Sequence, residues 1–126
     1  LDQDEISLAD RRAPLVIRQH AVRGRGVYTL ADLPAHTLLD VAPVLLMSEL
    51  HPPLDHYTFR WPGARPHALA LGIGSLLNHA AEPNAYFLRD IHHGLVRFYT
   101  LRPVAAGEEL FISYGNHLWF VDADAP

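Results

Sequence analysis

Short runs of hydrophobic and β-branched residues, separated by proline and glycine, form the main pattern of this chain. No long stretch shows the 3.6-residue period of an amphipathic helix. The chain is therefore predicted to be a mainly β domain. The runs that predict strands are Leu15 to Gln19, Gly26 to Leu30, Thr37 to Leu46, Tyr57 to Trp61, Ala85 to Arg89, Leu95 to Leu101 and Glu109 to Tyr114.

The segments between these runs predict turns and little helix. Ala68 to Leu77 is expected to form one or two short helical turns, interrupted by Gly72 and Gly74. Asp90 to Gly94 is typical of a hairpin loop, and Pro103 to Gly107 of a turn before the last strand. We find no repeat or linker, so we predict a single domain over residues 1–126 with its core at about 15–119.

Composition and charge exclude several classes of protein. The longest apolar run, Val41 to Met47, contains Pro43 and is far shorter than the roughly 20 residues that cross a bilayer, so we predict no membrane segment. The absence of cysteine excludes disulfides, thiolate catalysis and cysteine-bound zinc within this chain. A net charge of −4 without a basic run argues against direct nucleic-acid binding and suits either a basic partner or ordinary solubility.

Three local motifs contain candidate chemistry. Gly24, Arg25 and Gly26 open a predicted strand, where glycines let the backbone turn tightly or approach a ligand; taken alone, such a motif is more often a plain turn. Asn78 and His79 follow an apolar run, and their donors and acceptors suit either an adenine edge or a helix cap. Tyr114 ends the last predicted strand, as a site residue or as a half-buried core tyrosine.

Taken together and in order, these motifs resemble the SET-domain methyltransferases, in particular their small viral and fungal members. The resemblance runs from about Val22 to Trp119. It rests on Gly-Arg-Gly-Val at 24–27, an aromatic segment from Tyr57, Asn78-His79 with Pro83-Asn84, and Gly-Glu-Glu-Leu at 107–110 leading to Tyr114-Gly115. It implies a fold of several short β-sheets with few short helices and a C-terminal pseudoknot, in which residues 78–84 meet residues 109–114.

The same resemblance implies S-adenosylmethionine-dependent methylation of a protein lysine. It assigns cofactor binding to Gly24, Arg25, Gly26, Asn78 and His79, and makes Tyr114 the catalytic residue. We expect Tyr57, Phe98 and Leu118 to contact the substrate lysine. Free lysine has a pKa of about 10.4, so its amine must lose a proton before it can attack the methyl group. An apolar channel beside a cationic sulfonium lowers that pKa, so no dedicated base is needed.

The family also suggests partners and a location. Histone H3 is the expected substrate, with a non-histone protein as the alternative, and a nuclear location follows from the histone. Leu118 stands where small relatives carry an aromatic residue, so we expect higher methylation states to be tolerated. The apolar residues Leu118, Trp119 and Phe120 favour a homodimer.

Two other classes of function stay open at the level of the sequence. One is a binding module that keeps the SET fold without turnover. The other is a histidine-based metal protein, since nine histidines are many for this length and His92 and His93 are adjacent. Neighbouring residues in an extended hairpin point to opposite faces, so we predict no metal site.

Overall fold

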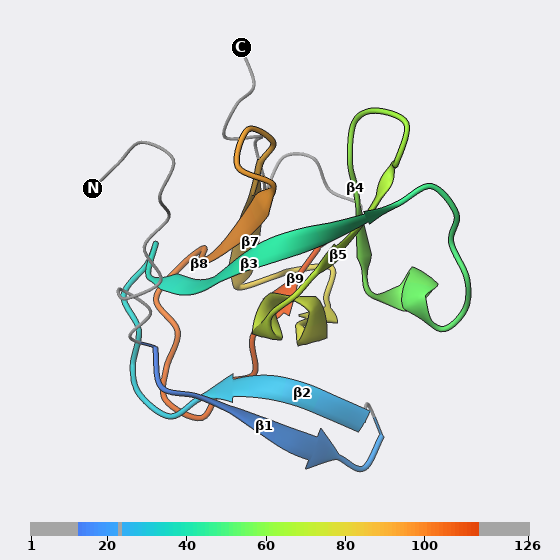
Figure 1. Ribbon diagram of the computed structural model, residues 1–126. Helices are drawn as coiled ribbons and strands as arrows, with labels where there is room; N and C mark the ends of the chain where they lie inside the picture. The colour runs from blue at the N-terminus through green and yellow to red at the C-terminus, as the bar shows by residue number, and fades with distance from the viewer. Residues whose placement is uncertain (1–12, 23, 114–126) are drawn as a thin grey trace.

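The computed structural model describes residues 13–22 and 24–113, and this part of the chain is almost entirely strands and turns (Figure 1). The predicted mainly β fold class is confirmed. The strands are β1 (Leu15–His20), β2 (Gly24–Thr29), β3 (Leu38–Met47), β4 (Thr58–Arg60), β5 (His67–Ala70), β6 (Asn78–His79), β7 (Ala85–Asp90), β8 (Leu95–Thr100) and β9 (Phe111–Ile112), and two short 3₁₀ helices are η1 (Leu54–His56) and η2 (Ile73–Leu76).

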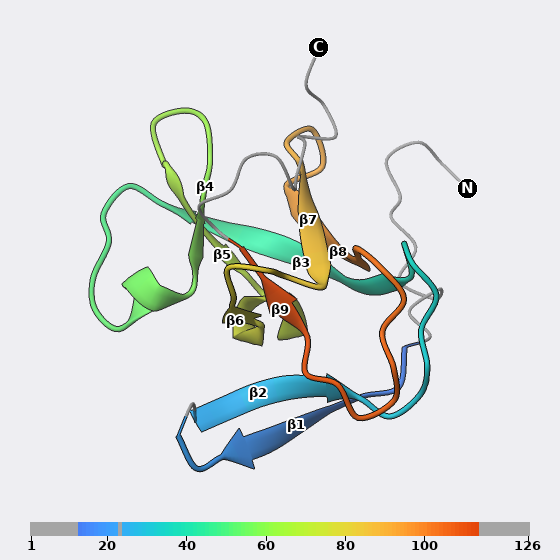
Figure 2. The same ribbon diagram turned by 180° about the vertical axis from the view of Figure 1, so that it is seen from behind.

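The described strands form three separate sheets. The largest has the order β4-β5-β3-β8-β7, and the other two are the hairpin β1-β2 and the parallel pair β6-β9. Seen from either side, η2, β6 and β9 lie between the large sheet and the β1-β2 hairpin (Figures 1 and 2). Segments from the middle and the end of the chain therefore meet at the centre of the molecule.

The core lies on one face of the large sheet, where alternate residues of the strands point inward. Phe87 of β7 and Phe98 of β8 are buried there beside Phe59 of β4. The ring of Phe59 stands edge-on to those of Phe87 and Phe98, with centroids 4.8 and 5.8 Å away. These contacts join strands from both halves of the chain into one core.

The segment Ala68 to Leu77, predicted to form helical turns, is only partly helical. Its first residues belong to β5, which pairs with β3 on one side and β4 on the other, and only Ile73–Leu76 forms a 3₁₀ turn. In β5 the buried residues are Ala68 and Ala70, so burial alternates along the segment as in a strand. Alanine gives little sign of this alternation in the sequence because it is common in helices as well. Pairing on both edges outweighs the helix preference of alanine.

The β7-β8 hairpin confirms the predicted loop and adds a buried ionic cluster. Gly94 has a positive φ of 66°, and Asp90 pairs with Leu95 at the hairpin end. Asp90 is 3% exposed, and its carboxylate accepts hydrogen bonds from the His93 backbone N–H (3.1 Å) and from Arg97 Nη1 (2.7 Å). His93 Nδ1 lies 2.9 Å from Asp90 Oδ2. Burial by itself raises the pKa of Asp90, but these hydrogen bonds outweigh it and hold the pKa below its usual value.

Residues 78–84 pack against residues 109–113, as the resemblance predicted for this part of the chain. Asn78 pairs with Phe111 and His79 with Ile112 in parallel. The buried side chain of Asn84 donates to the carbonyl of Glu109 (2.8 Å) and accepts from the Phe111 N–H (2.8 Å). An amide that satisfies two backbone groups of the neighbouring segment fixes its register.

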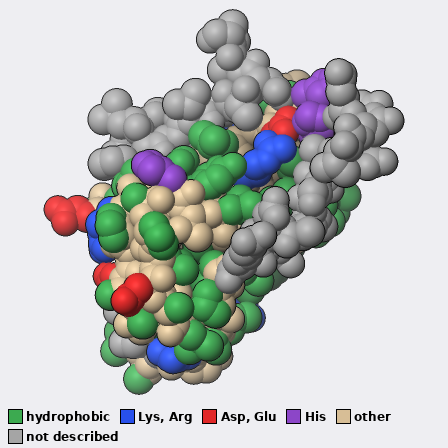
Figure 3. Space-filling view, turned by 90° about the vertical axis from the view of Figure 1, so that its left-hand side faces the viewer, with side chains coloured by type: hydrophobic (Ala, Val, Ile, Leu, Met, Phe, Trp, Pro, Cys, Tyr) green, Lys and Arg blue, Asp and Glu red, His purple; other side chains and the backbone are tan. Residues whose placement is uncertain are grey.

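The described surface is mixed in character. Hydrophobic side chains lie among polar ones on the face shown in Figure 3. Val22 of the β1-β2 hairpin is 87% exposed, and Leu30 and Leu71 are each 56% exposed. Within residues 13–22 and 24–113, no helix is long and apolar enough to cross a membrane.

Candidate cofactor and substrate site

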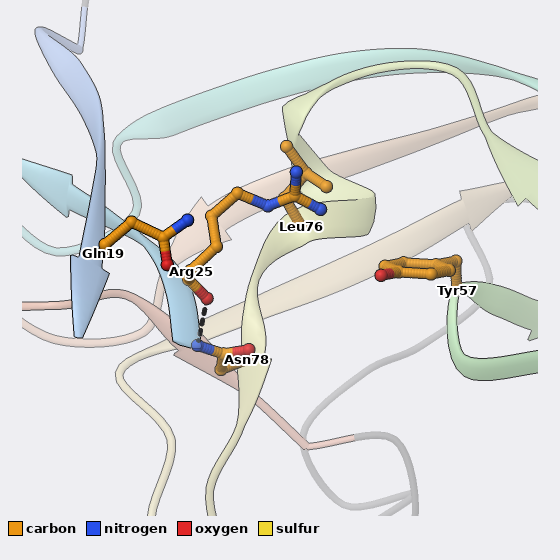
Figure 4. A pocket seen from close by; sticks show the side chains of 5 residues that line it. All are labelled: Gln19, Arg25, Tyr57, Leu76 and Asn78. Carbon is orange, nitrogen blue, oxygen red and sulfur yellow. Dashed lines mark hydrogen bonds between the residues drawn. The ribbon is translucent and has the colours of Figure 1, made fainter. Parts of the chain in front are cut away.

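A cavity of about 240 Å³ lies where the β1-β2 hairpin faces η2 and β6. Its lining residues come from five places in the sequence: Gln19, Arg25, Tyr57, Leu76 and Asn78 (Figure 4). Three of them, Arg25, Tyr57 and Asn78, were predicted as site residues. The structure therefore brings two predicted cofactor residues and one predicted substrate residue to the same cavity.

Asn78 is held by two acceptors. Its Nδ2 donates to the backbone carbonyl of Arg25 (2.9 Å) and to Glu109 Oε2 (2.7 Å). Both partners only accept, so the NH₂ group of the amide must face them. The oxygen, Oδ1, then lies on the side toward Tyr57, where Figure 4 shows it, and it makes no hydrogen bond to the described residues.

Gly26 makes room for this arrangement. A Cβ at Gly26 would stand 2.4 Å from Glu109 Oε2 and 3.2 Å from Asn78 Nδ2. The second glycine of Gly-Arg-Gly is thus required because a carboxylate and an amide occupy the space of its missing side chain. Gly24 has a different role, since it has a φ of +78° and nothing stands within 4 Å of its would-be Cβ.

The 3₁₀ helix η2, which brings Leu76 to the cavity, is fixed by the core. The buried carboxylate of Asp40 on β3 accepts from the Gly74 N–H (2.9 Å). A Cβ at Gly74 would stand 2.1 Å from the ring of Phe98, and one at Gly72 would stand 2.4 Å from Asp40 Oδ2. The two glycines that interrupt this segment therefore let η2 lie directly against the sheet.

The remaining predicted residues differ in where they lie. His79 is exposed on β6 and does not line this cavity. Phe98 is fully buried among the core aromatics, so the structure places it in the core and not at the cavity. Tyr114 and Leu118 lie outside the described residues.

Three site residues were missed by the sequence analysis. Gln19 lines the cavity because it pairs with Arg25 across the β1-β2 hairpin, and pairing the first two predicted strands would have revealed it. Leu76 was considered only as part of a helical turn. Glu109 was quoted within Gly-Glu-Glu-Leu but not assigned a role, because a glutamate before a hydrophobic strand gives no local sign of being buried.

The side chains around the cavity offer complementary polar groups on an apolar wall. Arg25 reaches toward Leu76 and carries a guanidinium, a donor suited to carboxylates (Figure 4). Asn78 offers the acceptor Oδ1, while Leu76 and the ring of Tyr57 supply apolar surface. A ligand with an anionic group, an amine and an apolar part would match this set, and S-adenosylmethionine has all three.

In the described part of the chain, no three histidine, aspartate or glutamate side chains come together in a way that could hold a metal ion. His92 and His93 contact each other edge-on, with ring centroids 4.6 Å apart. His93 is engaged with Asp90, as described above. The pair thus belongs to the hairpin cluster.

The comparison with protein families decides the assignment. The family model described as "SET domain" matches residues 24–115, which contain every lining residue of the cavity except Gln19. This chain belongs to the SET-domain family. The resemblance drawn from its motifs is confirmed, and with it the predicted fold and the methyltransferase class.

Individual relatives agree with the family. The chain is 42% identical over 118 residues to a Schizosaccharomyces pombe protein named histone-lysine N-methyltransferase, H3 lysine-37 specific, covering 88% of this chain and 80% of the relative. A candidate histone methyltransferase of Plasmodium falciparum has a similar structure, with a TM-score of 0.69, 26% identity, and coverage of 86% of this chain and 98% of that chain. KRYPTONITE, in complex with mCHH DNA, an H3(1-15) peptide and SAH, matches with a TM-score of 0.65 and 19% identity, over 85% of this chain and 24% of that one.

Proposed function

We propose that this chain methylates a lysine of histone H3 with S-adenosylmethionine as the methyl donor, and that the target is lysine 37 of the histone. The observation that supports this most strongly is the 42% identity to the H3 lysine-37 specific enzyme, spread over 88% of this chain. The same relative is covered over 80% of its own length, so the similarity takes in most of both chains.

The cavity residues fit the proposed cofactor. Arg25 would bind its carboxylate, and Asn78 Oδ1 would accept from its amine. A volume of about 240 Å³ is slightly below the roughly 300–1,000 Å³ of typical small-molecule sites, so we expect these residues to hold one end of the cofactor. Bound S-adenosylmethionine supplies an electrophilic methyl group on a sulfonium that leaves as a neutral thioether.

The protein's own groups would prepare the lysine. Tyr57 would supply an aromatic wall that excludes water from the amine. The apolar side chain of Leu76 disfavours a positive charge nearby, so it would lower the pKa of an entering lysine. Tyr114 would orient the amine for in-line attack.

A direct test is methyl transfer to recombinant H3 and to H3 in which the lysine at histone position 37 is replaced by arginine. All ten of the chain's Lys and Arg residues are arginines, so the enzyme has no lysine of its own to accept label. Label on wild-type H3 that disappears with this replacement supports the proposal. Label on another lysine corrects the site, and label on non-histone proteins alone corrects the substrate.

A SET-fold binding module is the second class to separate from the enzyme. It would bind SAH, the product of methyl loss from the cofactor, and transfer no label to any protein.

We propose a nuclear location because a histone substrate places the enzyme at chromatin. The homodimer expected from Leu118, Trp119 and Phe120, which lie outside the described residues, remains a prediction for sedimentation.

A further inference from the structure

Glu109 is a buried carboxylate that contacts the site without lining it. It is 7% exposed and lies two residues before β9. Its Oε2 accepts from Asn78 Nδ2 at 2.7 Å and fills the space beside Gly26. A carboxylate is costly to bury, so its retention at this place calls for a specific partner.

Glu109 controls which atom Asn78 presents to the cavity. The amide of a free asparagine can present either its donor or its acceptor side. Here both N–H groups of Asn78 are taken, one by Arg25 O and one by Glu109, so the acceptor Oδ1 faces the cavity. Without the carboxylate, one N–H loses its acceptor, and rotation of the amide would turn a donor toward the ligand.

The position of Glu109 is itself fixed from three sides. Asn84 donates to its carbonyl, and the Leu110 N–H donates to the carbonyl of Val27, which ties this segment to β2. Gly26 lies against the carboxylate without a side chain. A ligand-contacting residue held by a rigid neighbour is preorganised, which raises affinity by removing the cost of ordering it on binding.

We infer that Glu109 is a positioning residue for cofactor binding, and that its carboxylate holds Asn78 with Oδ1 facing the cavity. This inference rests on the proposed function, because it takes the cavity as the cofactor site. Glu109 acts through Asn78 and touches no reacting atom. Its loss therefore weakens cofactor binding more than it slows the chemical step at saturating cofactor.

The test is titration calorimetry of SAH with the wild-type chain and with Glu109→Ala, Glu109→Gln, Asn78→Ala and the double variant. We expect Glu109→Ala to weaken SAH by at least about tenfold, the usual effect of losing a hydrogen bond to a charged group. Glu109→Gln keeps an acceptor for Asn78 and should recover most of the affinity. The double variant should bind no more weakly than Asn78→Ala alone, because the two residues act as one unit.

Thermal unfolding of the same variants separates positioning from general stability. Asp90→Asn is the matched control: it removes another buried carboxylate charge, in the β7-β8 hairpin, and should lower the unfolding temperature without changing SAH affinity. If Glu109→Ala does not fold, Glu109→Asp keeps the charge but draws it back from Asn78, and it should also weaken SAH.

The SAH affinities of these variants distinguish a failure of the inference from a failure of the proposed function. If Glu109→Ala binds SAH with wild-type affinity, the inference is overturned and the proposed function is unaffected. The same holds for Glu109→Asp where Glu109→Ala does not fold. Additive losses in the double variant also overturn it, because they would mean that Glu109 acts independently of Asn78. A wild-type chain that binds no SAH contradicts the proposed function and the inference with it.

Discussion

Two buried carboxylates, Asp90 and Glu109, occupy different surroundings in this molecule. Asp90 is bonded to a guanidinium, a backbone N–H and an imidazole of its own hairpin. Glu109 is bonded to a neutral amide on a separate segment, and that amide keeps one acceptor directed at a cavity. The first cluster stabilises a turn, whereas the second orders a residue that lines the cavity. The two clusters thus differ in whether the partner of the buried carboxylate lines the cavity.

Among the variants that affect the proposed active site, Tyr114→Phe should cause the largest loss of methyl transfer. Removal of the hydroxyl takes away the group proposed to orient the lysine amine, so we expect kcat to fall by about 100-fold. SAH affinity should stay near that of the wild type, because the cofactor residues are untouched. Single-turnover methyl transfer at saturating cofactor measures the effect, and an unchanged rate would remove Tyr114 from the mechanism.

Gly26→Ala should damage the site by displacing Glu109. The new methyl group would stand 2.4 Å from Oε2, so the carboxylate and Asn78 must shift, and we expect SAH to bind at least about tenfold more weakly. Gly94→Ala in the β7-β8 hairpin is the matched control. There the would-be Cβ meets nothing within 4 Å, and the positive φ of 66° should cost only about 1 kcal/mol of stability. Equal SAH affinity in the two variants would contradict the role given to Gly26.

Asp90→Asn should affect stability and leave the site intact. Loss of the charge that bonds Arg97 and His93 should lower the free energy of unfolding by about 1–3 kcal/mol at pH 7. Because the pKa of Asp90 is lowered in the folded state, its contribution is full above the unfolded pKa of about 3.9 and is lost as the pH falls through the folded value. Urea unfolding from pH 7 to pH 3 should show the difference between wild type and variant shrinking at the acid end. A difference that grows toward acid pH would reverse this assignment.

Leu118→Tyr should give the smallest change. It should alter the methylation state of the product and leave the rate of methyl transfer unchanged. A larger side chain with a hydroxyl would narrow the lysine channel, so the proportion of di- and trimethyl-lysine should fall several-fold relative to the wild type. Mass spectrometry of the methylated H3 measures these proportions. A wild-type enzyme that stops at monomethyl-lysine would rule out the role proposed for Leu118.

Patterns local to the sequence predicted the strands and turns well. Proline and glycine mark the boundaries, and Gly94 and Gly107 both have the positive φ that their turns require. The segment at 68–77 was harder because alanine and leucine suit helix and strand alike, and only pairing with β3 and β4 makes His67–Ala70 a strand.

The candidate site was predictable where a motif carried it, as for Arg25 and Asn78. Phe98 was misplaced because an aromatic residue on a strand fits a channel and a core equally well until its neighbours are known. Glu109 reaches the site through a contact with Asn78, 31 residues away, and Gln19 through pairing with Arg25 across a hairpin. Neither contact can be read from a local sequence pattern.

The most direct test of the proposed function is mass spectrometry of recombinant H3 after incubation with this chain and S-adenosylmethionine, beside H3 that carries arginine at position 37. We predict methyl groups on lysine 37 of the wild-type histone and none at that position in the variant. Equal methylation of both histones, or of neither while SAH still binds, would contradict the proposed function.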